Sequence, residues 1–230
     1  MISTAENWKR INEAVAFEAE RCGRKPEEVK VMAVTKLHAA EEIRPLIESG
    51  CCLFGENRLA ESLEKWPQLN REGVSLHLIG HLQSNKAKAA VEFFDAVDSL
   101  DSLSTLLKVE KHAAAAGKRL SVLLEVNCSG EEAKHGFRDE TEFFRALEAA
   151  AGFEFVSVRG LMTMAALGAD EKTARAAFAR LRQLRDKAET ESGLRLPELS
   201  MGMSGDFRQA IVEGSTMVRI GTALFEGVPV

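Results

Sequence analysis

Residues 29–36 read Val-Lys-Val-Met-Ala-Val-Thr-Lys, a short apolar run, rich in β-branched residues, that closes on a lysine. Such a run predicts a strand buried on both faces, as in a parallel sheet. Period-two alternation would put Lys36 on the same face as Met32 and Val34. Because desolvating an ammonium group is costly, Lys36 either reaches into water or loses its proton beside apolar walls, where a neutral amine is a Schiff-base nucleophile. For a lysine taken alone, the first alternative is the commoner one.

The composition bounds the class of protein. With 230 residues, 45% of them hydrophobic, the chain can bury a full core in one large α/β domain or two small ones. The net charge is −5, and acidic and basic residues are interspersed along the chain, which argues against a nucleic-acid-binding surface. The sequence contains neither an apolar run long enough to span a membrane nor a signal peptide. Cys22, Cys51, Cys52 and Cys128 form no Cys-x-x-Cys pair, and the His-x-x-x-His spacing of His77 and His81 falls at an expected strand rather than on a helix. We therefore expect a cytoplasmic protein without disulfides or a metal centre.

The alternation of an apolar run with an amphipathic stretch repeats outward from residues 29–36. Ser3 and Glu6 form a capping box that predicts an opening helix, with Gly23 as its stop. Eight strands, each followed by a helix, predict a (β/α)8 barrel, and no linker divides residues 1–230, so we expect one domain. A doubly wound open sheet is disfavoured because no Gly-x-Gly-x-x-Gly follows the first strand. The expected strands are 29–36, 52–57, 75–80, 93–99, 120–127, 156–163, 198–203 and 217–222.

Several helix boundaries carry local signals. Ser84 and Asp101 are predicted to cap the helices that follow the third and fourth strands, and Asp170 to begin the long helix after the sixth. Pro45 is compatible with a helix over residues 41–49 only if it lies in the first turn.

Polar residues gather at the expected C-terminal ends of the strands, which form the working face of such barrels. Lys36 ends the first strand, while Asn57 and Asn127 end two others, although an asparagine taken alone is more often a cap. Arg219 interrupts the last buried strand, and alternation turns its side chain toward the barrel interior. A guanidinium there needs either an internal carboxylate or a ligand atom as its partner.

The last two loops suggest a phosphate site. Residues 204–206 and 221–223 each offer a hydroxyl, a glycine and free amides at the position where barrels usually bind phosphate. Ordinary N-capping, with Asp206 at one helix end, is the alternative. A lysine for an aldehyde, a cradle for a phosphate and Arg219 for a polar ring atom together indicate pyridoxal 5′-phosphate. A Schiff-base sugar-phosphate aldolase would leave Arg219 unexplained.

Six motifs, spread in order over essentially the whole chain, carry a family resemblance. They are Ala-Val-Thr-Lys at 33–36, Phe-Gly-Glu-Asn-Arg at 54–58, His-Leu-Ile-Gly-His-Leu-Gln-Ser-Asn-Lys at 77–86, Gly-Leu-Met-Thr at 160–163, Leu-Ser-Met-Gly-Met-Ser at 199–204 and Gly-Ser-Thr-Met-Val-Arg-Ile-Gly-Thr-Ala at 214–223. The sequence resembles the pyridoxal phosphate homeostasis proteins, whose fold is related to the N-terminal barrel of alanine racemase.

The resemblance assigns roles to individual residues. It implies that Lys36 carries pyridoxal 5′-phosphate as an aldimine and that Arg219 lies at the pyridine nitrogen. It also implies that Ser204, Gly221 and Thr222 hold the phosphate. A further implication is that Asn57 lines the pocket.

Two functions remain open: a carrier or buffer in intracellular vitamin B6 homeostasis, and an amino-acid racemase or other small enzyme that uses the cofactor. A cation at the ring nitrogen weakens the ring as an electron sink, which favours the carrier. Racemisation needs an acid–base group on each face, and the resembling racemases supply the second as a tyrosine from another domain; this chain contains no tyrosine, so His81 or Cys128 would have to replace it. We therefore expect a monomeric carrier without catalytic residues, whose partners are the cofactor and recipient apo-enzymes.

Overall fold

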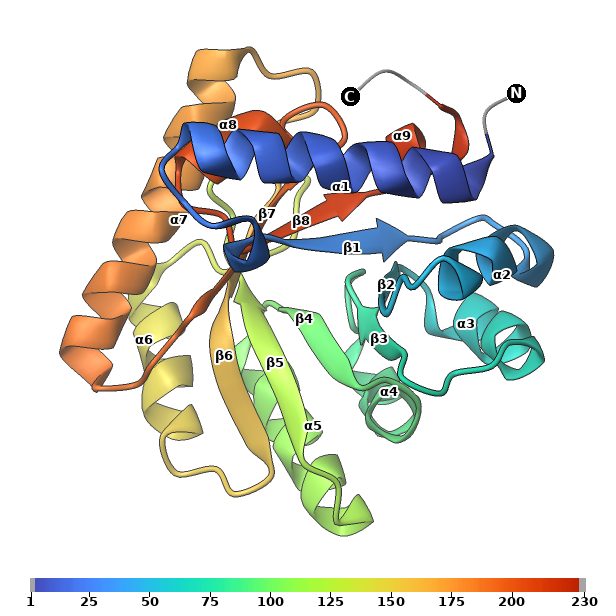
Figure 1. Ribbon diagram of the computed structural model, residues 1–230. Coiled ribbons are helices and arrows are strands. Elements are labelled where there is room, and N and C mark those ends of the chain that lie inside the picture. The colour runs from blue at the N-terminus through green and yellow to red at the C-terminus, as the bar shows by residue number, and fades with distance from the viewer. Residues whose placement is uncertain (1–2, 228–230) are drawn as a thin grey trace.

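The structure is a computed structural model that describes residues 3–227. Within these residues, eight parallel strands pair in chain order and close into a barrel, with β1 joined to β8 (Figure 1). The predicted (β/α)8 architecture is therefore confirmed. The strands are β1 (Lys30–Val34), β2 (Leu53–Glu56), β3 (Ser75–Leu78), β4 (Ala96–Leu100), β5 (Leu120–Glu125), β6 (Val156–Met162), β7 (Glu198–Met203) and β8 (Met217–Ile220).

Helices cover the outside of the barrel. The main ones are α1 (Thr4–Arg21), α2 (Ala40–Glu48), α3 (Leu59–Lys65), α4 (Ala87–Phe93), α5 (Leu103–Ala116), α6 (Glu140–Ala150), α7 (Glu171–Ser192), α8 (Phe207–Val212) and α9 (Thr222–Phe225). Short 3₁₀ turns lie at Pro26–Glu28, Trp66–Gln68 and Ser84–Lys86. None of the helices within residues 3–227 combines the length and the apolar character needed to cross a membrane.

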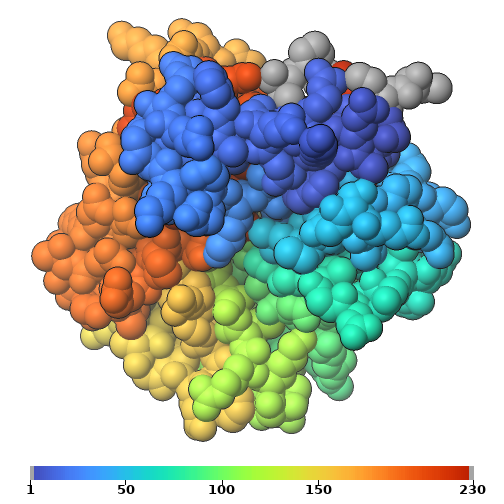
Figure 2. All heavy atoms as spheres, viewed as in Figure 1, coloured from blue at the N-terminus to red at the C-terminus, as the bar shows by residue number. Residues whose placement is uncertain are grey.

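The extra N-terminal helix α1 precedes the barrel and lies across it, as expected. The Ser3 hydroxyl caps it by accepting the amide hydrogen of Glu6 at 3.2 Å. The side chain of Asn7 donates to the carbonyl of Leu224 in α9 at 3.0 Å, which joins the two ends of the described chain. Figure 2 shows the blue side chains of this N-terminal segment packed against the cyan segment that follows β1.

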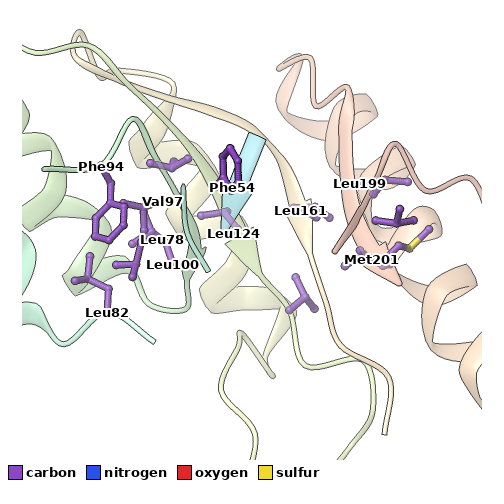
Figure 3. Packing of buried hydrophobic residues seen from close by; sticks show 14 of the residues in the cluster. Phe54, Leu78, Leu82, Phe94, Val97, Leu100, Leu124, Leu161, Leu199 and Met201 are labelled. Carbon is purple, nitrogen blue, oxygen red and sulfur yellow. The ribbon is translucent and has the colours of Figure 1, made fainter. Parts of the chain in front are cut away.

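Apolar side chains divide between the two faces of the strands. Val31 and Ala33 belong to the large core between strands and helices, some of which appears in Figure 3. Met32 points the other way, into a smaller cluster inside the barrel with Leu123 and Met162. The period-two alternation predicted for the first strand is therefore confirmed, and it directs the face that carries Met32 and Val34 toward the barrel axis.

Two predicted helix caps are wrong. The Ser84 hydroxyl caps no helix, because Ser84 begins the 3₁₀ turn that precedes α4; it accepts instead from the Nζ of Lys108 at 2.9 Å. Ser102, rather than Asp101, caps α5 by accepting the amide hydrogen of Thr105 at 3.3 Å. The predicted cap was therefore one residue too early in the sequence, and the Asp101 carboxylate is free to bind other partners.

Other boundaries also differ from expectation. Pro45 is the sixth residue of α2 and not in its first turn. The helix tolerates it because the carbonyl that loses its hydrogen bond belongs to exposed Glu41, where water can replace the missing donor. Phe93 ends α4, and β4 begins only at Ala96. The predicted start of the long helix α7 is confirmed, since Asp170 accepts the amide hydrogen of Thr173 at 2.7 Å.

Candidate functional site

A pocket of about 590 Å³ opens at the C-terminal ends of the strands. It brings together residues from the loops after β1, β2, β3, β6, β7 and β8. All six residues assigned to the site from the sequence line it: Lys36, Asn57, Ser204, Arg219, Gly221 and Thr222.

Lys36 lies two residues beyond the end of β1 and is exposed toward the pocket opening. Within residues 3–227 it forms no hydrogen bond or ion pair with another side chain. The alternative of an ammonium buried among apolar walls is therefore wrong for this structure, because the strand ends before the lysine and its side chain stays accessible. The next residue, Leu37, has a φ of 67°, which is uncommon for a residue other than glycine and is often associated with functional sites.

A buried polar network anchors the backbone just before Lys36. The Glu56 carboxylate is fully buried and accepts from the Thr35 hydroxyl at 2.5 Å and from the Trp66 indole at 3.1 Å. The Lys65 ammonium lies 2.6 Å from the same carboxylate and donates to the Thr35 carbonyl at 2.8 Å. The hydroxyl and the carbonyl of Thr35 are thereby fixed, so the backbone from which the Lys36 side chain starts is held in place. The sequence reasoning missed this network, although Glu56 lies in one of the quoted motifs.

Arg219 points into the barrel, as its position in β8 predicted, and is 4% exposed. Its guanidinium donates to the Ser200 hydroxyl and to the Thr163 carbonyl, both at 2.8 Å. Burial lowers the pKa of Arg219, and the negative charges of Asp98 and Glu125 oppose that shift. The guanidinium thus has neutral hydrogen-bond partners that fix its plane, while it also lines the pocket.

Glu125, at the end of β5, lines the pocket but was not predicted as a site residue. It is 3% exposed, and burial raises its pKa to about 7; the negative charge of Asp101 adds to the shift, while Arg219 opposes it. The sequence pattern that pointed to Arg219, a charged residue within an aliphatic strand, could also have pointed to Glu125. A carboxyl group with this pKa can hold or release a proton near neutral pH.

The loops after β7 and β8 form one cradle. The Ser204 hydroxyl accepts the amide hydrogen of Ala223 at 3.2 Å, which ties the two loops together. In the described part of the chain, the amides of Gly205 and Thr222 donate to no other protein group. A Cβ on Gly221 would lie 3.4 Å from Val34, so the loop runs close to the end of β1. A hydroxyl and free amides beside a pocket fit a phosphate group.

Asp206 occupies the N-cap position of α8, as the N-capping alternative expected, but its side chain makes no capping hydrogen bond there. Its carboxylate instead accepts the amide hydrogen of Met203 at 2.5 Å. Burial raises the pKa of Asp206, although that hydrogen bond opposes the shift. The residue therefore shapes the turn after β7, in which the Gly205 amide donates to no group of the described chain.

Of the other residues considered from the sequence, some line the pocket and others do not. Asn127 does not line the main pocket, and its amide donates to the carbonyls of Glu131 and Lys134 within its own loop, at 2.9 and 3.2 Å. Asn127 is thus a loop cap, whereas Asn57 lines the pocket and caps no helix. Of the two candidate second bases, His81 lines the pocket, but Cys128 is buried in the outer core and does not.

Residues 6–229 match the family model of the alanine racemase N-terminal domain, which defines the class of barrel. An alanine racemase from Clostridium difficile superposes with a TM-score of 0.71 at 18% identity, covering 94% of this chain and 55% of that one. That likeness concerns the fold alone.

Relatives of higher sequence identity belong to a more specific family than the racemase domain. The pyridoxal phosphate homeostasis proteins of Vibrio alginolyticus and Pseudomonas aeruginosa are 36% and 38% identical, each over 98% of this chain and over 97% and 96% of the relative. The structure of PipY from Synechococcus elongatus with PLP bound has a TM-score of 0.82 at 36% identity, covering 92% of this chain and 99% of that one. This chain belongs to the pyridoxal phosphate homeostasis protein family.

Proposed function

We propose that the chain binds pyridoxal 5′-phosphate in the pocket at the C-terminal ends of the strands. The observation that carries the proposal is the convergence of an accessible amine, a buried guanidinium and an anion cradle on one cavity. Ser204, Gly221 and Thr222 would hold the phosphate, Asn57 would line the pocket beside the cofactor, and Arg219 would lie at the ring nitrogen. The Nζ of Lys36 would bind the aldehyde carbon covalently. The PLP-bound structure of PipY, a relative at 36% identity, supports the same choice of cofactor.

We further propose that the protein carries or buffers the cofactor inside the cell and passes it, as a monomer, to apo-enzymes. When bound, pyridoxal phosphate supplies an electron sink whose strength depends on protonation of its ring nitrogen. A guanidinium at that nitrogen disfavours its protonation, so Arg219 would hold the ring in a form poorly suited to carbanion chemistry. The lack of any tyrosine in the sequence also argues against a racemase of the two-base kind. The exposure of Lys36 suits reversible capture and release.

The test is reduction of the loaded protein with borohydride, followed by peptide mapping. Wild type should absorb in the visible and carry one pyridoxyl group, on Lys36. Lys36→Ala should lose the covalent adduct but unfold at the same urea concentration, because the side chain is exposed and makes no contact that the fold requires. Lys111→Ala, which removes another exposed lysine on α5, is the matched control and should behave as wild type.

A main adduct on any other lysine would overturn the assignment of Lys36. The carrier function has a separate test, in which loaded protein is mixed with a cofactor-free pyridoxal phosphate enzyme and recovery of activity is followed. If the enzyme gains cofactor no faster than the protein releases it into buffer, the carrier function would be contradicted and only storage of the cofactor would remain. Conversion of L-alanine to D-alanine by wild type but not by Lys36→Ala would establish the racemase instead.

A further inference from the structure

Three loops bring two imidazoles and a carboxylate together at the rim of the pocket. His81 follows β3, Asp101 follows β4 and His135 lies between β5 and α6. Their ligand atoms all lie within 4.8 Å of one another, and we call them the His81–Asp101–His135 cluster. The expectation of no metal centre rested on short-range histidine spacing, whereas these ligands are 20 or more residues apart in sequence.

The geometry within the cluster is specific. The Nδ1 atoms of His81 and His135 lie 2.8 and 3.5 Å from the same oxygen, Oδ2 of Asp101. The two rings stack with their centroids 3.8 Å apart and their planes 9° from parallel. Both imidazoles therefore present the same nitrogen to one carboxylate oxygen.

These separations lie near those that a metal ion imposes, and the shorter one is also a hydrogen bond between His81 and Asp101. With bonds of about 2.0–2.1 Å and tetrahedral angles, the ligand atoms of Zn²⁺ lie roughly 3.3 Å apart. The two nitrogen–oxygen distances, 2.8 and 3.5 Å, fall on either side of that value. Small rotations of the rings would turn both Nδ1 lone pairs toward one ion.

We propose that the His81–Asp101–His135 cluster is a binding site for a divalent transition metal ion, with Zn²⁺ as the ion that fits it. Two imidazole nitrogens and one carboxylate oxygen suit Zn²⁺ and its neighbours Co²⁺ and Ni²⁺, whereas Mg²⁺ and Ca²⁺ prefer oxygen ligands. Three protein ligands leave a fourth coordination position open. His81 and His135 both line the pocket, so that position lies at its rim.

A metal ion here would tie the loop between β5 and α6 to the ends of β3 and β4. The loop is already held near its base, where Lys134 donates to the Ala165 carbonyl at 2.8 Å. His135 itself is 56% exposed and is the outermost of the three ligands. Metal binding should therefore order residues 127–138 above the pocket.

The experiment measures metal binding to the cofactor-free chain without an affinity tag, so its outcome does not depend on the proposed function. Isothermal titration with Zn²⁺ and metal analysis after gel filtration should give one ion per chain in the Cys52→Ser background, which removes the exposed thiol. Asp101→Asn and His135→Ala should each weaken binding at least about tenfold. His112→Ala, on α5 outside the cluster, should leave it unchanged.

Co²⁺ identifies the ligands, because a nitrogen and oxygen site gives weak visible bands without a thiolate charge-transfer band. Hydrogen exchange over residues 127–138 should slow when Zn²⁺ is added to wild type and not when it is added to His135→Ala. Unchanged stoichiometry and affinity in Asp101→Asn and His135→Ala would overturn the proposal. So would a strong thiolate band with Co²⁺, or Zn²⁺ affinity no better than millimolar.

Discussion

At the scale of single residues, burial governs the carboxyl groups that face the pocket. Glu125 ends an aliphatic strand, and its side chain is enclosed beside Arg219. Burial penalises the ionised form, so the pKa rises to about 7 from the 4.5 of an unperturbed glutamate. The folded chain therefore binds one more proton than the unfolded chain over that interval of pH.

This shift predicts a pH-dependent gain in stability for Glu125→Gln. Below about pH 4.5 the carboxyl is protonated in both states and contributes nothing; as pH rises to 7 only the unfolded state ionises, so wild type loses stability. The full penalty, roughly 3 kcal/mol, is reached above pH 7. Urea unfolding of cofactor-free protein should show Glu125→Gln more stable than wild type at pH 8 and nearly equal at pH 4.5. The same difference at both pH values would contradict the shift.

At the scale of elements, the strand ends are held together by close backbone contacts. A Cβ on Gly80, just after β3, would lie 2.1 Å from the Asn57 carbonyl oxygen after β2. The Ser99 hydroxyl of β4 donates to the Gly80 carbonyl at 2.7 Å. Residue 80 therefore has to be a glycine, because the ends of β2, β3 and β4 converge there and leave no room for a side chain. The position of Asn57 in the pocket depends on this close approach.

Gly80→Ala should accordingly affect both stability and binding. The backbone of Asn57 has to move to make room, which should cost about 1–3 kcal/mol in the free energy of unfolding. Pyridoxal phosphate affinity should fall as well, because a pocket residue is displaced. Gly152→Ala is the control, since its new Cβ would lie 3.7 Å from the nearest atom, an ordinary contact. Equal stability of the two variants would show that the strand ends adjust freely.

At the scale of the whole molecule, a ligand that contacts loops from both halves of the barrel stabilises the closed fold. Lys36 and Asn57 belong to the first half of the strand order, and Ser204, Arg219 and Thr222 to the second. A ligand bound only by the folded state raises the free energy of unfolding by mass action.

Pyridoxal phosphate at 100 times its Kd should raise the free energy of unfolding by about 2.7 kcal/mol. For a chain of this size that corresponds to a rise in Tm of roughly 5–10 °C, measured by thermal unfolding. Pyridoxal at the same concentration should give about half the rise or less, since loss of the phosphate contacts should weaken binding at least tenfold. Identical shifts for the two compounds would place the phosphate outside the cradle of the last two loops.

The sequence by itself determined the barrel, the inward face of its first strand and the positions of Lys36 and Arg219. Those features follow from periodicity and from charged residues that end or interrupt apolar strands, which are local patterns. Only the tertiary structure decided that Lys36 is exposed, that Glu56 and Lys65 pair beneath it and that Glu125 has a pKa near 7. It also decided the meeting of His81, Asp101 and His135. Burial and contact between residues far apart in sequence arise when the sheet closes, and no short stretch of the chain contains that information.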